Sequence, residues 1–119
     1  MPYSLNMADT SVYELRTYHA APGRLADLEA RFRDHTMALF RKHGIEVVGF
    51  WRPLDEPDCQ NTLIYVLRFP SRSNGSECWK AFQSDPAWIE AKRQSEVNGV
   101  LAESIDSVFM EPTDFSPIR

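Results

Sequence analysis

Glu14 and Arg16 are the residues whose types and spacing most directly suggest chemistry, a carboxylate and a guanidinium two positions apart. The stretch Val12–Tyr18 alternates as a β-strand does, which puts Glu14, Arg16 and Tyr18 on one face, the first two about 7 Å apart along the strand. Arg16 could hold an anionic or carbonyl-bearing ligand through its planar fork, while Glu14 serves as a general base or hydrogen-bond acceptor. The alternative is an ion pair that only satisfies a semi-buried face.

The two faces of this strand differ in character. Tyr13, Leu15 and Thr17 form the face that fits a hydrophobic core. On the other face Tyr18 could donate its hydroxyl to a ligand, although a tyrosine at a strand end also packs with its tip in water. If the Glu14 face looks into an enclosed space, it is the polar floor of a pocket. If it looks into solvent, it is an ordinary surface.

A histidine at the edge of the first expected helix offers a second kind of chemistry. The apolar pattern predicts a long helix from Pro22 to about His43, ended by Gly44. Its buried stripe is expected to hold Leu25, Leu28, Phe32, Thr36, Leu39 and His43, with Phe40 at the edge. His35 lies beside this stripe and could act as a proton shuttle or haem ligand if it faces a cavity. Otherwise it is a structural histidine, and the histidine spacings support no Ser-His-Asp triad.

Aromatic side chains are abundant, with three tryptophans and seven phenylalanines among 119 residues. Phe50, Trp51 and Trp79 are candidates for the walls of a pocket that takes a flat or apolar ligand. The alternative is that these aromatic rings only fill the hydrophobic core.

Composition restricts the class of protein. With 43% hydrophobic and 25% charged residues, the chain is expected to form one soluble globular domain. Its net charge of −4, with Lys and Arg spread along the chain, argues against a nucleic-acid partner. No apolar run reaches the length of a membrane span, about 18 residues. Residues 1–11 are expected to be a flexible leader without the pattern of a signal peptide, so we expect a cytoplasmic protein.

The two cysteines indicate neither a disulfide framework nor a metal site. Cys59 falls in a turn-like segment and Cys78 in an expected helix, without the Cys/His spacing of metal ligands. Free thiols in a reducing compartment are therefore expected. The sequence also has no phosphate loop or nucleotide fingerprint, so we expect no metal and no cofactor.

The order of expected elements predicts the fold class. Strands and helices are expected, in order, at Val12–Tyr18 (strand), Pro22–His43 (helix), Ile45–Arg52 (strand), Thr62–Phe69 (strand), from near Ser76 (helix), from Pro86 (helix) and at Val100–Met110 (strand). Pro70–Gly75 is expected to be a polar breaker before the second helix. This βαββαβ order is that of α+β, ferredoxin-like folds, in which helices cover one face of a four-stranded antiparallel sheet and the first and third strands are central.

The second and third strands are expected to be apolar on both faces. Alternation groups Ile45, Val47, Gly49 and Trp51 on one face of the second strand, and Leu63, Tyr65, Leu67 and Phe69 on one face of the third. A lone domain would expose the remaining apolar face as a patch, and such patches usually mark interfaces. We therefore expect a two-fold homodimer in which two sheets face each other.

Several longer motifs support this fold. They are ELRTY at 14–18, PGRL at 22–25, RFRDHT at 31–36, LFRKHGIEVVGFW at 39–51, WKAFQSDPAW at 79–88 and PTDFSP at 112–117. The chain resembles the NIPSNAP family in these motifs, from Val12 to the C-terminus. The resemblance implies a dimeric α+β barrel over residues 12–111, of a superfamily that also holds cofactor-free monooxygenases, isomerases and haem enzymes. Residues 112–119 would form a tail, with Phe115 as an anchor onto the partner or the cavity mouth.

Three functions follow as hypotheses. The first is a small-molecule binder, possibly with cofactor-free enzymatic chemistry, which predicts a pocket of a few hundred Å³ with convergent polar groups. The second is a non-catalytic dimeric interaction or scaffold module, which predicts a filled interior. The third, haem binding at His35, rests on superfamily analogy alone.

Overall fold

A computed structural model describes residues 11–119 and confirms the α+β, ferredoxin-like fold. The elements are β1 (Val12–Ala20), α2 (Leu25–Arg31), the π-helical η1 (Phe32–Thr36), α3 (Met37–Lys42), β2 (Glu46–Trp51), the 3-10 helix η2 (Asp58–Gln60), β3 (Thr62–Phe69), α4 (Arg72–Ser84), α5 (Pro86–Ser95) and β4 (Ala102–Met110). The leader expected at residues 1–11 lies outside the described residues except for Ser11, which is buried and accepts a hydrogen bond from Nε of Arg68.

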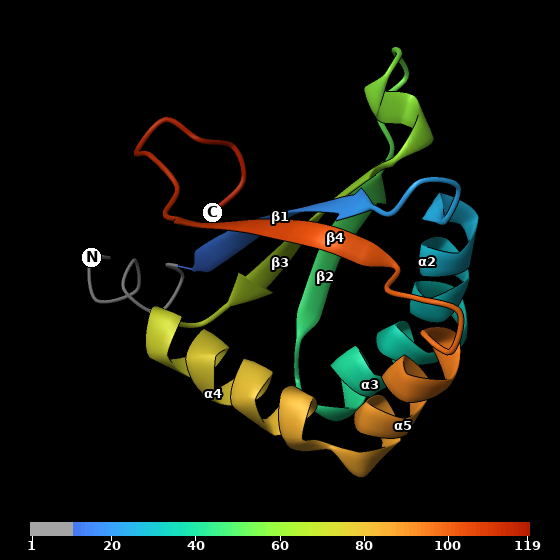
Figure 1. The fold of residues 1–119 in the computed structure, drawn as a ribbon. Helices are drawn as coiled ribbons and strands as arrows, with labels where there is room; N and C mark the ends of the chain where they lie inside the picture. The colour runs from blue at the N-terminus through green and yellow to red at the C-terminus, as the bar shows by residue number, and fades with distance from the viewer. Residues whose placement is uncertain (1–10) are drawn as a thin grey trace.

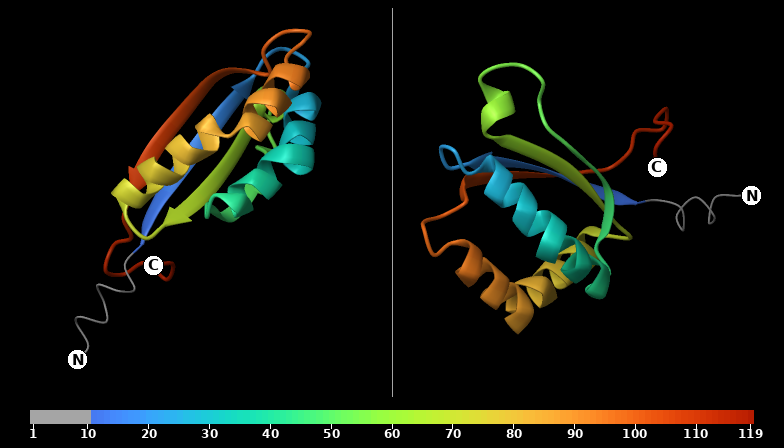
Figure 2. Two further views of the ribbon diagram at one scale, coloured as in Figure 1. Left: turned by 90° about the horizontal axis from the view of Figure 1, so that it is seen from below. Right: turned by 90° about the vertical axis from the view of Figure 1, so that its right-hand side faces the viewer.

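The sheet has the strand order β2-β3-β1-β4, and every neighbouring pair is antiparallel. The prediction that the first and third strands are central is therefore correct. All the longer helices lie on one side of the sheet, while the segment that holds η2 projects on the other side (Figure 1). Viewed from below, α4, α5 and the long helix cover the sheet (Figure 2). We call these two sides of the sheet the helix side and the open side.

The faces of β1 are the reverse of the simplest expectation. Glu14, Arg16 and Tyr18 pair in register with Leu67, Tyr65 and Leu63 of β3 and lie on the helix side. The expectation that the Tyr13 face of this strand meets the core is wrong, because that face belongs to the open side. A charged face can be buried here because its charges and hydroxyls are bonded to one another.

The faces of β2 differ from those expected because the strand contains a β-bulge. Val47 pairs with Leu67 of β3, but the next paired residue is Gly49, so Val48 is an extra residue. The bulge shifts the alternation by one. Phe50 therefore turns to the helix side, and Gly49 and Trp51 turn to the open side. The grouping of Gly49 and Trp51 with Val47 is wrong for this reason.

The long helix forms as predicted, with a π-turn in its middle. It begins at Leu25 rather than at Pro22, after a turn in which Gly23 has φ of +74°. The predicted stripe is buried at Leu28, Phe32, Thr36, Leu39 and Phe40. The π-turn of η1 spans Phe32–Thr36, and such turns are frequent at functional sites.

The second helix starts earlier than expected. α4 begins at Arg72, and the side chain of Ser71 accepts a hydrogen bond from the Asn74 N–H at its start. The expectation of a breaker over Pro70–Gly75 is wrong, because Gly75 is a buried helical residue. A Cβ at Gly75 would lie 3.1 Å from the Phe69 ring, so glycine lets the helix lie close on the sheet.

The start of α5 agrees with the prediction from the sequence. Asp85 caps α5 by accepting from the Ala87 N–H, and Pro86 takes the first helical position, as predicted.

The core joins the helix side of the sheet to the helices through Tyr18, Leu28, Phe32, Leu39, Phe40, Ile45, Leu63, Tyr65, Leu67, Phe69, Phe82 and Leu101.

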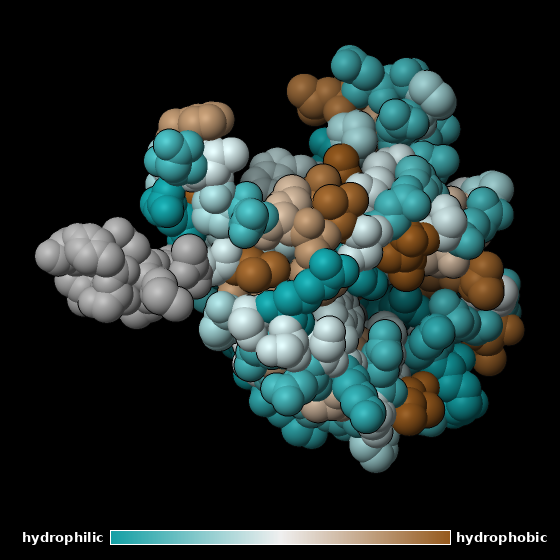
Figure 3. Space-filling model, turned by 90° about the vertical axis from the view of Figure 1, so that its left-hand side faces the viewer, coloured by the Kyte–Doolittle hydropathy of each residue, from teal (hydrophilic) through white to brown (hydrophobic). Residues whose placement is uncertain are grey.

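Hydrophobic residues also remain exposed. On the open side these are Val48, Trp51, Val108 and Met110, and Phe115 in the tail is 82% exposed. Figure 3 shows that hydrophobic residues reach the surface in several groups among hydrophilic ones. None of the helices within residues 11–119 has the length and apolar character needed to cross a membrane.

Candidate functional site

Glu14 is an almost fully enclosed carboxylate, with 1% of its surface exposed. Its Oε1 accepts a hydrogen bond from Nε1 of Trp79 at 2.6 Å. Its Oε2 accepts from Nη1 of Arg16 at 2.9 Å and from Oγ of Ser107 at 2.5 Å. Three donors from α4, β1 and β4 thus hold the carboxylate, and they compensate its burial.

Arg16 is fixed on three of its five N–H groups. Its Nε donates to the Tyr65 hydroxyl at 2.8 Å, Nη1 donates to Glu14, and Nη2 donates to the Tyr18 hydroxyl at 3.1 Å. Its guanidinium carbon lies 4.2 Å from the centroid of the Trp79 ring. One N–H on each of Nη1 and Nη2 is left without an acceptor among the described residues. Burial alone would lower the pKa of Arg16, but Tyr65, Tyr18 and Glu14 raise it above its ordinary value, so the group stays cationic.

Tyr65 and Tyr18 complete the polar cluster. The Tyr65 hydroxyl accepts from Arg16 and donates to the Tyr18 hydroxyl at 3.0 Å. Burial, together with Tyr18, raises the pKa of Tyr65 well above its ordinary value. Tyr65 therefore stays a neutral phenol that relays a hydrogen bond from the cation to Tyr18.

A cavity of about 620 Å³ lies over this cluster, between the helix side of the sheet and the helices. We call it the Arg16 cavity. Aromatic rings from η1, α3, α4 and α5 supply much of its wall, and charged side chains from α5 lie at its rim. The lining includes Arg16, Tyr18, Arg31, Phe32, Thr36, Phe40, Trp79, Phe82, Trp88, Lys92, Arg93, Glu96 and Ile105. A cationic floor between aromatic walls suits a ligand with an apolar body and a polar oxygen.

The structure brings some of the predicted site residues together and separates others. Arg16, Tyr18 and Trp79 line the Arg16 cavity, and Glu14 is bonded to two of them. Phe50 and Trp51 instead line a second cavity of about 500 Å³ beside β2.

His35 lies apart from both of these cavities. It is exposed and lines a third cavity, of about 220 Å³, between the long helix and the end of α5. Its position next to the stripe is as predicted. The cluster around Arg16 forms without it.

Comparisons with known proteins show the family of the chain. The family model described as NIPSNAP matches residues 13–117. The chain belongs to the NIPSNAP family. The resemblance noted from its sequence motifs is therefore confirmed. No curated protein matches the chain.

Solved structures of NIPSNAP proteins share this fold. One from Agrobacterium tumefaciens is 22% identical with a TM-score of 0.79, and the alignment covers 92% of this chain and 99% of the other. A second from that organism, of unknown function, is 24% identical with a TM-score of 0.76, covering 92% and 94%. An uncharacterised NIPSNAP-like domain protein from Burkholderia xenovorans is 18% identical with a TM-score of 0.76, covering 90% and 89%. At these identities the likeness shows the fold.

Several residues of the site in this NIPSNAP chain were missed from the sequence. Tyr65 was expected only as one of the residues grouped on a face of the third strand, and nothing in the sequence marked Arg31 as part of a site. Ser107 pairs with Arg16 across the β1–β4 ladder, a contact that required the strand order. Arg31 follows the stripe residue Leu28 by three positions, so it lies next to the stripe on the helix surface. This pattern was the available signal that Arg31 is buried.

The NIPSNAP chain shows no metal centre in its described part. Among residues 11–119, no group of three or more His, Cys, Asp or Glu side chains is arranged to hold a metal ion. The Glu56 carboxylate, which accepts a hydrogen bond from the thiol, raises the pKa of Cys59, and burial raises the pKa of Cys78. Both thiols are thereby disfavoured as thiolate nucleophiles.

Proposed function

We propose that this NIPSNAP protein binds a small molecule in the Arg16 cavity of a homodimeric α+β barrel. The observation that carries the proposal is Arg16 itself. It is a cation only 13% exposed, stacked on Trp79, with two N–H groups left for a ligand oxygen. Rigid, desolvated donors of this kind bind carbonyl and carboxylate oxygens strongly.

Glu14 and Arg16 have different roles in this proposal. Glu14 already accepts three hydrogen bonds, so it fixes Arg16 and Trp79 in place. Arg16 is the group that meets the ligand and would polarise a carbonyl bond. If the bound molecule reacts, the protein contributes orientation, exclusion of water and this positive charge, without a cofactor.

The open side of the sheet supports the homodimer. Val48, Trp51, Val108 and Met110 are exposed there in the single chain. Burying them against a second copy of the same face would remove this apolar surface from water and close the two sheets into a barrel. The free cysteines fit a reducing compartment, and we propose that the protein is cytoplasmic.

The alternative is a non-catalytic scaffold, which the same apolar face would equally serve. A scaffold requires no interior space. The Arg16 cavity, with two cationic N–H groups directed at no described residue, is the observation that favours a ligand.

Native mass spectrometry of freshly purified protein tests both parts, by comparison with the mass of the denatured chain. We expect a dimer that carries additional mass, and Arg16→Ala should lose that mass. Arg41→Ala is the matched control because Arg41 is an exposed arginine on α3 outside the Arg16 cavity. A dimer without additional mass in any preparation would favour the scaffold, and a monomer would contradict the barrel.

A further inference from the structure

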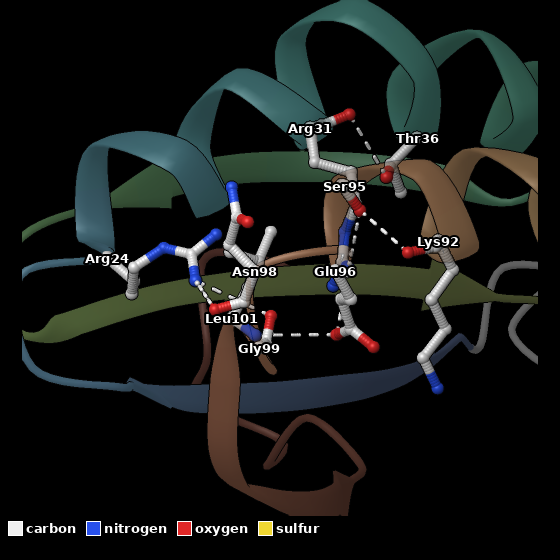
Figure 4. Close-up of polar contacts among 9 residues, drawn as sticks. All are labelled: Arg24, Arg31, Thr36, Lys92, Ser95, Glu96, Asn98, Gly99 and Leu101. Carbon is white, nitrogen blue, oxygen red and sulfur yellow. Dashed lines mark hydrogen bonds and ion pairs between the residues drawn. The ribbon is translucent and has the colours of Figure 1, made fainter.

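Arg31, the last residue of α2, is a buried arginine that lines both the Arg16 cavity and the smaller third cavity beside His35. Its side chain is 5% exposed, and its guanidinium carbon lies 5.0 Å from the centroid of the Trp88 ring. Its Nη1 donates to Oγ of Ser95 and to Oε2 of Glu96, both at 3.2 Å. Figure 4 shows Arg31 on the long helix close to Ser95 and Glu96 at the end of α5. The guanidinium is thus held by hydrogen bonds from a single nitrogen, Nη1, and by the Trp88 ring.

The other edge of the Arg31 guanidinium is unused. Its Nε is shielded from solvent and has no hydrogen-bond partner among residues 11–119. Nη2 likewise donates to none of the described residues, since the bonds of this group run through Nη1. Nε and Nη2 lie on the same side of the planar group and form the edge that can bind both oxygens of a carboxylate. Buried donors are normally paired, so this edge indicates a missing acceptor.

Arg16 offers a ligand something different. Its Nε is already bonded to Tyr65, and its Nη1 is bonded to Glu14 at 2.9 Å. Only single N–H groups on Nη1 and Nη2 remain. Arg16 is therefore suited to a neutral oxygen, and Arg31 has the free bidentate edge.

The charge around the cavity fits one anion. Arg31 is paired with Glu96, and Arg93 is paired with Glu90 at the rim. Lys92 also lines the cavity and has no carboxylate partner among the described residues. With the Arg16–Glu14 pair also neutral, the exposed Lys92 leaves one positive charge at the rim, which favours an anionic ligand over a cationic one.

We infer that Arg31 binds the carboxylate of the ligand, and that the ligand is an apolar or aromatic monocarboxylic acid. Its apolar body lies against the aromatic lining of the cavity, which includes Trp79, Phe82 and Trp88, and a carbonyl or hydroxyl oxygen at its other end reaches Arg16. The inference rests on the proposed function, because it assigns the ligand class of the same cavity.

Isothermal titration calorimetry of the full chain with naphthylacetic acid and its methyl ester tests the assignment. The wild type should bind the acid about tenfold or more tightly than the ester, because only the acid has a charge for the free edge. Arg31→Gln should abolish this preference by weakening the acid much more than the ester. Arg16→Gln should weaken both compounds to a similar extent. Arg41→Gln, an exposed change on α3, should behave as wild type.

The outcomes separate the inference from the proposed function. Equal wild-type affinity for acid and ester, or a preference that survives in Arg31→Gln, would overturn the assignment while small-molecule binding stands. If the wild type bound neither compound, the ligand class inferred here would be contradicted, while native mass spectrometry would still decide the proposed function. Should Arg31→Gln fail to fold by circular dichroism, Arg31→Lys takes its place. It keeps the charge without the planar edge, and an undiminished acid preference in it would overturn the assignment.

Discussion

The indole of Trp79 holds both members of the Glu14–Arg16 pair. Its ring centroid lies 4.2 Å from the guanidinium carbon of Arg16, and its Nε1 donates to Glu14 at 2.6 Å. The carboxylate and the cation are also bonded directly to each other. The three side chains form a closed triangle in which α4 fixes the orientation of two residues of β1.

Trp79→Phe removes one corner of this triangle while keeping an aromatic ring. The buried Glu14 carboxylate would lose a donor, so we expect the free energy of unfolding to fall by about 1–3 kcal/mol. Urea denaturation measures the change. Trp51→Phe is the matched control. Trp51 lies on the open side and its indole donates to none of the described residues, so its change keeps a ring, removes no hydrogen bond and should cost less than that of Trp79. Equal effects of the two variants would contradict the role given to Trp79.

Glu14→Ala leaves Arg16 as a buried cation without its carboxylate. Breaking a buried pair from one side costs about 3–5 kcal/mol, whereas replacing both partners by apolar groups costs less. Urea denaturation should therefore show that Glu14→Ala combined with Arg16→Met is more stable than Glu14→Ala alone. If the two losses simply added, the ion pair would not be the source of the effect.

Gly75 and Gly49 should respond differently to alanine. In α4 the new methyl of Gly75→Ala would lie 3.1 Å from the Phe69 ring, which is fully buried. The crowding costs about 1–3 kcal/mol and outweighs the better helix propensity of alanine, about 1 kcal/mol. In Gly49→Ala the close atom belongs to Trp51, which is half-exposed and can swing away, so little change is expected. Thermal unfolding of both variants decides between these outcomes.

The order of the helices and strands could be predicted from the sequence, but the burial of a strand face could not where contacts between distant residues determine it. The βαββαβ order, the strand Thr62–Phe69 and the cap at Asp85 could be predicted because periodicity and capping are local. The face of β1 could not, because whether Glu14 and Arg16 can be buried depends on Trp79, which lies 65 and 63 positions away in the sequence.

Two further errors have the same origin. The bulge at Val48 turned Trp51 to the open side, and the only local sign of it was the neighbouring Gly49, since a glycine within a strand often marks a bulge. The burial of Arg31 could not be expected, because charged helix residues usually lie in solvent, yet Trp88 and Glu96 of the distant C-terminal half lie against it. The sequence therefore predicted the site residues of β1 and the aromatic Trp79, but not those that distant contacts bring to the site.

Asp85 should make stability fall in acid. Hydrogen bonds from Lys42, from His43 and from the Ala87 N–H hold the pKa of its carboxyl far below the ordinary value. A carboxyl whose pKa is lowered by folding stabilises the native state above its unfolded pKa, about 3.9. That contribution is lost as the pH falls further.

The test follows the melting temperature of the protein from pH 6 to pH 2.5, about the range in which carboxyls of this kind titrate. Asp85→Asn keeps a capping side chain but loses the charge, so its curve should be flatter than the wild-type curve below about pH 4. Glu90→Gln is the comparison. Arg93 lowers the pKa of Glu90 in an exposed, screened pair, so the flattening should be smaller. Parallel curves for wild type and Asp85→Asn would contradict the prediction.

Val108→Asp should separate the proposed homodimer. Val108 is exposed on the open side of β4, where a two-fold interface between sheets would bury it. An unpaired carboxylate in a desolvated interface costs several kcal/mol. We therefore expect the dissociation constant of the dimer to rise by about a hundredfold or more. Sedimentation velocity over a concentration series measures the dissociation constant. Val97→Asp is the matched control, because it is the same substitution at an exposed valine between α5 and β4. It should leave the dissociation constant unchanged. A dimer that tolerated Val108→Asp would have to use another surface, and the open side would then face solvent or a different protein.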